Sequence, residues 1–147
     1  MKENTDQKDN TYQNLKNSLN LTLYLCYYLR LNDKEVRKEL CILLNKIFVD
    51  FLNVPKNIVK SLTEQMIIGK GIALNRALKE NLFTCFTCVD NLVPLIIVGK
   101  PGTGKSLSCQ ILYNTLMGEF SKSEIFKKKG NYILIITKVL RQVLLKE

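Results

Sequence analysis

The chain has 147 residues, of which 46% are hydrophobic and 24% charged. This length suits one ordinary domain, and this balance excludes a chain that is disordered throughout. An excess of 22 Lys and Arg over 13 Asp and Glu gives a formal net charge of +9. Such a charge favours anionic partners such as nucleotides, nucleic acids or acidic membrane surfaces, although lysines scattered over solvated helix faces would produce it equally well.

The cysteines and the apolar runs bear on location. Five cysteines, an odd number, occur without an apolar leader after Met1, which favours a reducing compartment, and we expect a cytoplasmic protein. The longest apolar runs, residues 23–29 and 92–98, are far shorter than the roughly 18 residues that a membrane-spanning helix needs. The sequence therefore predicts no membrane span.

The amino-terminal part predicts a polar tail followed by helices. Residues 1–11 are nearly all polar or charged and cannot bury enough apolar surface to offset chain entropy, so we expect a disordered tail. Residues 12–66 form the expected helical segment, because apolar residues recur there at three- and four-residue intervals. Within it, Asn32 followed by Glu35 resembles a capping box and predicts a helix start, and Pro55 predicts the start of a further short helix.

The second part of the chain predicts a helix and then a strand. Gly69 and Gly71 mark the expected boundary, and we assign residues 67–147 to a second unit. Residues 72–91 carry apolar side chains at helical spacing and predict a long helix. Residues 94–98 form a short, β-branched apolar run between Pro and Gly, as expected of a buried parallel strand.

The residues directly after that run, 99–106, match the pattern G-x-x-x-x-G-K-[ST] at every specified position. Glycines let main-chain amides approach a polyphosphate closely, the lysine would face the β and γ phosphates, and the final hydroxyl would coordinate Mg²⁺. The expected ATP-binding residues are Gly99, Lys100, Pro101, Gly102, Thr103, Gly104, Lys105, Ser106 and Leu107, with Ser106 also the metal ligand. The alternative is a glycine-rich turn with an exposed lysine.

Acidic residues are scarce after this loop. No Asp follows Asp90, so the aspartate motifs that GTPases use for Mg²⁺ and guanine are absent, and ATP is the expected nucleotide. A later strand candidate, residues 132–136, leads into Thr137 and Lys138 and not into the acids that hold Mg²⁺ in phosphoryl-transfer enzymes. We therefore assign no catalytic residue and expect ATP binding without visible hydrolytic machinery.

A longer pattern around the loop resembles a known family. Residues 99–106 are similar to the phosphate loop of AAA+ proteins, and residues 71–78, 93–102 and 121–124 together resemble an AAA+ unit of the mysterin family. That family joins a dynein-like AAA+ core to a RING-bearing ubiquitin ligase region. The resemblance, over residues 67–130, implies an α/β fold: a partial P-loop NTPase three-layer core preceded by an α-helical segment.

The resemblance also implies cofactors and partners. It implies ATP and Mg²⁺ as cofactors, and the remaining AAA+ units of a larger chain or neighbouring subunits as partners. Ligase chemistry is not expected of this chain itself, because it has no His and no RING or other zinc signature. Cys85 and Cys88 have C-x-x-C spacing, but we expect them to act as small apolar residues of a helix.

A function of a different class stays open at this point. The chain could be a basic helical module that binds nucleic acid or a protein, with a vestigial phosphate loop. Nucleic acid is the less expected partner, because the basic run 127–129 lacks interleaved aromatic residues and resembles a solvated loop. Binding of nucleotide distinguishes the two functions.

We predict negligible ATPase turnover for the isolated chain, because Mg²⁺ would lack its acidic ligand and no arginine is supplied by a second subunit. Phosphate release from ATP and Mg²⁺ should stay below about 1 s⁻¹, the lower end of the usual enzyme range. Faster turnover would show that a catalytic carboxylate has been missed.

Overall fold

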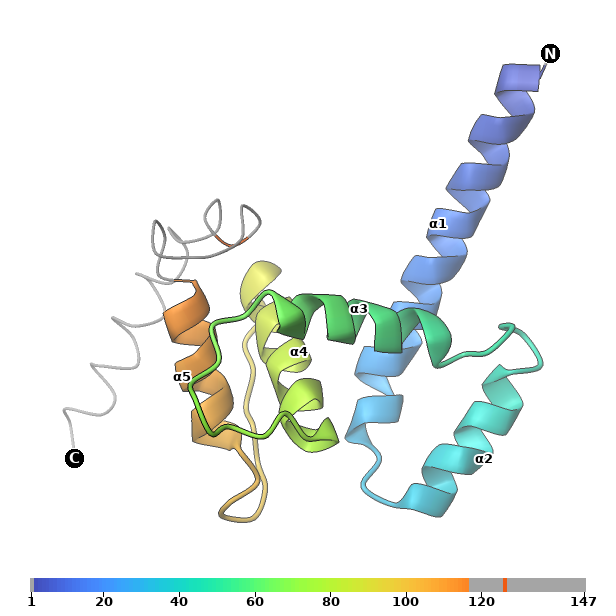
Figure 1. Ribbon diagram of the computed structural model, residues 1–147. Coiled ribbons are helices and arrows are strands. Elements are labelled where there is room, and N and C mark those ends of the chain that lie inside the picture. The colour runs from blue at the N-terminus through green and yellow to red at the C-terminus, as the bar shows by residue number, and fades with distance from the viewer. Residues whose placement is uncertain (1, 117–125, 127–147) are drawn as a thin grey trace. The chain divides into compact units, whose positions relative to one another are not determined.

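The computed structural model describes residues 2–116 and 126. The elements are α1 (Lys2–Cys26), a 3₁₀ turn η1 (Tyr28–Arg30), α2 (Lys34–Leu44), α3 (Asn53–Glu64), α4 (Arg76–Asp90) and α5 (Lys105–Thr115) (Figure 1). The chain divides into two compact units, Met1–Ile58 and Val59–Glu147. The predicted division into a tail, a helical segment and a nucleotide-binding module, at 11/12 and 66/67, stays a prediction. None of the described helices is both long and apolar enough to cross a membrane.

The first unit contains helices at the positions that apolar periodicity predicted. Helix α1 also includes most of residues 1–11, for which the sequence predicted a disordered tail. Once the more apolar part of a helix has formed, each further residue adds a hydrogen bond at little entropic cost, which accounts for a helix that runs into a polar segment.

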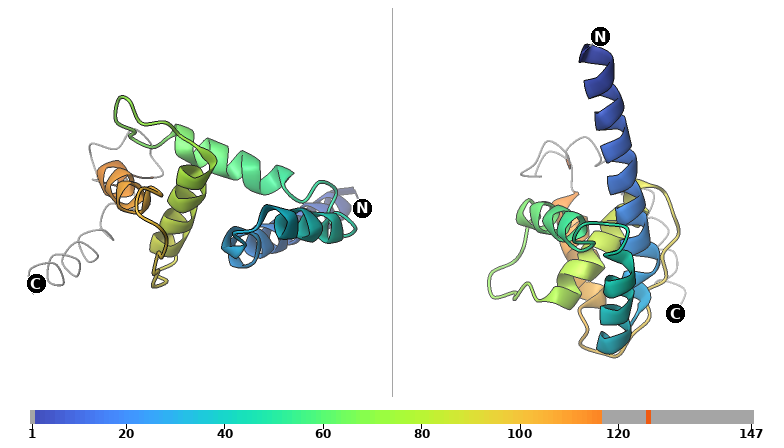
Figure 2. Two further views of the ribbon diagram at one scale, coloured as in Figure 1. Left: turned by 90° about the horizontal axis from the view of Figure 1, so that it is seen from below. Right: turned by 90° about the vertical axis from the view of Figure 1, so that its right-hand side faces the viewer.

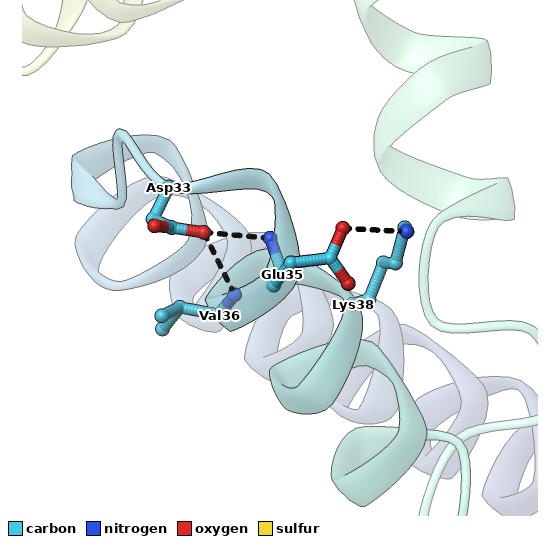
Figure 3. Close-up of polar contacts among 4 residues, drawn as sticks. All are labelled: Asp33, Glu35, Val36 and Lys38. Atoms are coloured by element: carbon cyan, nitrogen blue, oxygen red, sulfur yellow. Dashed lines mark hydrogen bonds and ion pairs between the residues drawn. The ribbon is translucent and has the colours of Figure 1, made fainter.

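The start of α2 is capped by Asp33, one residue later than the predicted cap at Asn32. The Asp33 carboxylate accepts hydrogen bonds from the amides of Glu35, at 2.7 Å, and of Val36, at 3.3 Å (Figure 3). The Glu35 side chain does not complete a capping box but pairs with Lys38 Nζ at 2.8 Å. Asp and Asn are equally good caps, so sequence spacing alone could not separate the two neighbours.

Aromatic side chains form the core of the first unit. The rings of Tyr28 and Phe51 meet edge to face, with centroids 6.2 Å apart. Arg37 is buried beside them: its guanidinium lies 4.8 Å from the Tyr28 ring centroid, and its Nε donates to the Leu31 carbonyl at 2.6 Å. The buried cation is therefore stabilised by a π face and a carbonyl.

In the second unit, α4 and α5 pack against one another (Figures 1 and 2). Asn75 caps α4, because its Oδ1 accepts from the amide of Leu78 at 2.9 Å. The segment after α3 is tied to α5 by a hydrogen bond of 3.0 Å from the Ile67 amide to Thr115 Oγ1. Between these elements lies a buried cluster of mainly aliphatic residues: Met66, Leu78, Leu82, Cys85, Ile111, Leu112, Leu116 and Phe126.

The predicted α/β three-layer core is wrong for this structure, which is helical. No strand occurs in residues 2–116 or at 126, and residues 94–98, predicted to be a buried strand, form an unpaired extended segment. Ile97 packs against the cluster, whereas Ile96 and Val98 on the opposite side are each 88% exposed. A β-strand needs neighbours to pair its amides and cover its faces, and the described residues supply none. The other strand candidate, residues 132–136, lies outside them.

Removal of the α4 cap should destabilise the chain. Asn75→Ala leaves the Leu78 amide without its side-chain acceptor, so we expect a loss of about 0.5–2 kcal/mol in the free energy of unfolding. Urea unfolding followed by circular dichroism measures it. Asn75→Asp keeps a side-chain oxygen that can accept from the Leu78 amide and should unfold near the wild-type midpoint. An equal loss in both variants would contradict the capping role.

Paired truncations test the corrected fold of residues 94–98. Leu82→Ala, at a side chain that is 0% exposed, should cost about 2–5 kcal/mol, because a cavity replaces packed methyl groups. Ile96→Ala should change stability by no more than about 0.5 kcal/mol, as expected of a solvated side chain. If urea unfolding gave both variants a similar large loss, residues 94–98 would be buried as a strand after all.

Candidate functional site

The loop that matches the phosphate-binding pattern connects the extended segment 94–98 to α5. Two of its glycines have the left-handed backbone that side chains rarely adopt: φ is +79° at Gly102 and +79° at Gly104. Gly104 also lies close to α4, since a Cβ added there would be 3.4 Å from Leu78 Cδ1. The turn into α5 therefore depends on glycine at these positions.

Lys105, the first residue of α5, folds its side chain back over this loop. Its Nζ donates to the carbonyls of Gly99 and Lys100, at 2.7 Å each, and lies 3.3 Å from Thr103 Oγ1. The Thr103 hydroxyl donates in turn to the Lys100 carbonyl at 2.8 Å. The ammonium group is thus held inside the turn by oxygen atoms, where it is available to an anion that approaches the loop.

The start of α5 is suited to negative charge. Gly104 is the N-cap residue and offers no side-chain cap, so the first amides of the helix have no capping side chain as partner. The Gly104 carbonyl accepts a hydrogen bond of 2.6 Å from the hydroxyl of Ser108, which is fully buried. Uncapped amides beside a lysine fit the oxygen atoms of a phosphate.

The remaining predicted site residues are Pro101, Ser106 and Leu107. Pro101 and Ser106 are exposed at the loop, and Leu107 is half-buried against the aliphatic cluster. The Ser106 hydroxyl is therefore accessible to a cation. The described part of the chain contains no group of three or more His, Cys, Asp or Glu that could hold a metal. A Mg²⁺ ion at Ser106 would need phosphate oxygens and water as its remaining ligands.

Sequence reasoning missed one residue that joins the loop to its scaffold. Asn81 on α4 donates from Nδ2 to the Thr103 carbonyl at 3.2 Å. The sequence contained a clue to this contact. Leu78 and Leu82 form the buried face of α4, and Asn81 lies beside that face, where a polar side chain can contact a neighbouring segment. Asn75 and Arg76, which belong to the family-like segment 71–78, make structural contacts: Asn75 caps α4, and Arg76 pairs with Glu80 at 3.3 Å.

Comparison with known proteins identifies relatives of this unit. The family model described as "RNF213 AAA domain" matches residues 71–139, a range that includes the loop. The E3 ubiquitin-protein ligase RNF213 of Homo sapiens is 32% identical over 114 residues, which are 75% of this chain and 2% of that protein. The E3 ubiquitin-protein ligase rnf213-beta of Danio rerio is 30% identical over 115 residues, 74% of this chain and 2% of its own length.

A third relative agrees with these two. The E3 ubiquitin-protein ligase RNF213 of Mus musculus is 32% identical over 117 residues, again 75% of this chain and 2% of that protein. No solved structure matches. The chain thus spans about 2% of the length of the curated relatives that it matches. The expected mysterin resemblance is confirmed: residues 71–139 match the AAA domain of RNF213, and 75% of the chain is similar to RNF213, that is mysterin, proteins.

Proposed function

We propose that residues 99–106 bind the triphosphate of ATP together with Mg²⁺. The observation that carries the proposal is the position of Lys105, whose ammonium is held by the Gly99 and Lys100 carbonyls at 2.7 Å each, at the uncapped start of α5. A cation and helix-start amides without a side-chain cap lie close together in this turn. This combination is the one that a polyphosphate requires.

Binding exchanges one set of partners for another. The Lys105 ammonium leaves the two carbonyls and pairs with oxygens of the β and γ phosphates, a charge-assisted interaction that is stronger than the neutral one it replaces. Amides at the start of α5 and the positive end of its dipole contribute to the same phosphates. The Ser106 hydroxyl, exposed beside them, supplies one ligand to Mg²⁺, and phosphate oxygens and water supply the others.

The packing of the loop suggests how a bound nucleotide acts on the rest of the unit. Thr103 is hydrogen-bonded to Asn81 of α4, and Gly104 to Ser108 of α5, so a change in the loop reaches both helices. In the intact protein, ATP binding and hydrolysis would drive conformational work, with other AAA+ units as partners. Since the relatives are E3 ubiquitin-protein ligases, we propose that this work serves a protein of that kind. Cytoplasmic location stays a prediction.

Substitution of the loop lysine tests the proposal. Lys105→Ala should weaken Mg²⁺-dependent ATP binding at least tenfold, which is about 1.4 kcal/mol, because the phosphates lose the charged partner that the first residue of α5 supplies. Isothermal titration at low salt measures the affinity. Lys70→Ala is the matched control: it removes an equal charge from an exposed side chain of the second unit outside the loop and should retain nearly wild-type binding.

Two outcomes would contradict the proposal. Folded wild-type protein without Mg²⁺-dependent affinity for ATP would exclude a working phosphate site. Equal losses in Lys70→Ala and Lys105→Ala would mean that only the overall charge matters. A third result would favour the alternative function. If neither the wild-type chain nor Lys105→Ala bound ATP, but both bound an oligonucleotide, the chain would be better described as a basic helical module that binds nucleic acid.

A further inference from the structure

Helix α4 contacts the main chain of the phosphate loop at the peptide bond between Thr103 and Gly104. The Asn81 side chain donates from Nδ2 to the Thr103 carbonyl at 3.2 Å, although the two residues are 22 positions apart in sequence. Leu78, three residues earlier on the same side of the helix, lies close to the other half of this bond, since a Cβ added to Gly104 would be 3.4 Å from its Cδ1. Both residues that share the peptide bond are therefore in contact with α4.

The orientation of this peptide decides which of its polar groups faces away from the helix. The part of the chain that the structure describes has no cis peptide bond. In a trans peptide the C=O of one residue and the N–H of the next point in opposite directions. Because Asn81 binds the Thr103 carbonyl from the side of α4, the Gly104 N–H points away from that helix.

Glycine at position 104 makes the opposite orientation accessible as well. Turning the peptide over changes mainly ψ of Thr103 and φ of Gly104, and glycine adopts positive and negative φ about equally readily. The observed φ of +79° at Gly104 is thus one of two accessible values. In the other orientation a carbonyl oxygen would replace the N–H, and its partial negative charge would repel a phosphate. The hydrogen bond from Asn81 exists only in the first orientation and therefore favours it.

We propose that Asn81 is a positioning residue for nucleotide binding, which keeps the Thr103–Gly104 peptide turned so that the Gly104 N–H donates to a phosphate of the nucleotide. The inference rests on the proposed binding of ATP by residues 99–106, and it adds a residue outside the loop that determines the affinity. Asn81 acts through the main chain of the loop and not by touching the nucleotide.

The same contact extends to the loop lysine. The Thr103 hydroxyl donates to the Lys100 carbonyl at 2.8 Å and lies 3.3 Å from Lys105 Nζ. A displacement of Thr103 would therefore move one of the oxygen atoms that surround the ammonium group. The hydrogen bond from Asn81 thus supports two groups that would bind phosphate, the Gly104 amide and the Lys105 ammonium.

The test compares two asparagines of the same helix. Asn81→Ala removes the donor to the loop, whereas Asn91→Ala removes a similar bond, from Asn91 Nδ2 to the Thr87 carbonyl at 2.8 Å, that stays at the end of α4. Isothermal titration of the full chain, with Mg²⁺ and either ATP or inorganic tripolyphosphate, measures the affinity. We expect Asn81→Ala to weaken both ligands by the same factor, about three- to tenfold, the effect of one net hydrogen bond. Asn91→Ala should bind both as the wild type does.

Nuclear magnetic resonance of the ¹⁵N-labelled chain follows the peptide itself. In the wild type, tripolyphosphate with Mg²⁺ should move the Gly104 amide proton downfield, as expected of an N–H group that donates to a charged oxygen. In ligand-free Asn81→Ala the Gly104 resonance should split or broaden, because both orientations of the peptide become populated, and in Asn91→Ala it should not. A loss of stability alone would leave this resonance unchanged in the folded protein, and circular dichroism shows that both variants are folded at the temperature of titration.

Three results would overturn the inference and leave the proposed function standing. These are wild-type affinity in Asn81→Ala, equal losses in Asn81→Ala and Asn91→Ala, or a wild-type Gly104 amide that does not respond to bound tripolyphosphate. The last measurement needs no substitution, so it does not depend on whether a variant folds. A folded wild-type chain without affinity for either ligand would instead overturn the proposed function, and this inference with it.

Discussion

Packing of α4 against α5 is the contact on which the second unit depends. Leu78 and Leu82 on α4 meet Ile111 and Leu112 on α5, and burial of such side chains contributes roughly 1.5–3 kcal/mol each. The same contact positions both supports of the loop, because Asn81 projects from α4 and Ser108 from α5. Without this interface the loop would be a flexible connection between two helices, and neither its turn nor its lysine would be held.

The loop is held in shape before any ligand is present. Its left-handed glycines set the turn, and the hydrogen bonds of Lys105 close it from one side. A site whose donors are already oriented loses less conformational freedom on binding than a loop that must first be ordered. The carbonyls that hold the ammonium are neutral acceptors in an exposed turn, so a charged phosphate competes with them effectively. The arrangement therefore combines a defined shape with a partner that can be displaced.

The helices were predictable because their signal is local. Apolar residues three and four positions apart lie on one face in any helix, so the sequence placed α4 within residues 72–91, and the cap of α2 was missed by one residue. The strand at residues 94–98 was predicted wrongly for the opposite reason. Its alternating pattern was real, since Ile97 faces the cluster and Ile96 faces solvent, but a strand also requires a partner that no local pattern can supply.

The sequence by itself determined the loop, because the spacing of Gly99, Gly104, Lys105 and Ser106 is a property of consecutive residues, and the matching family model spans these residues. Only the tertiary structure decided where the Lys105 ammonium lies and that Asn81 supports Thr103. These contacts join residues from different helices or different parts of a turn. Their geometry follows from how two helices pack, and helix packing depends on side chains that are distant in the chain.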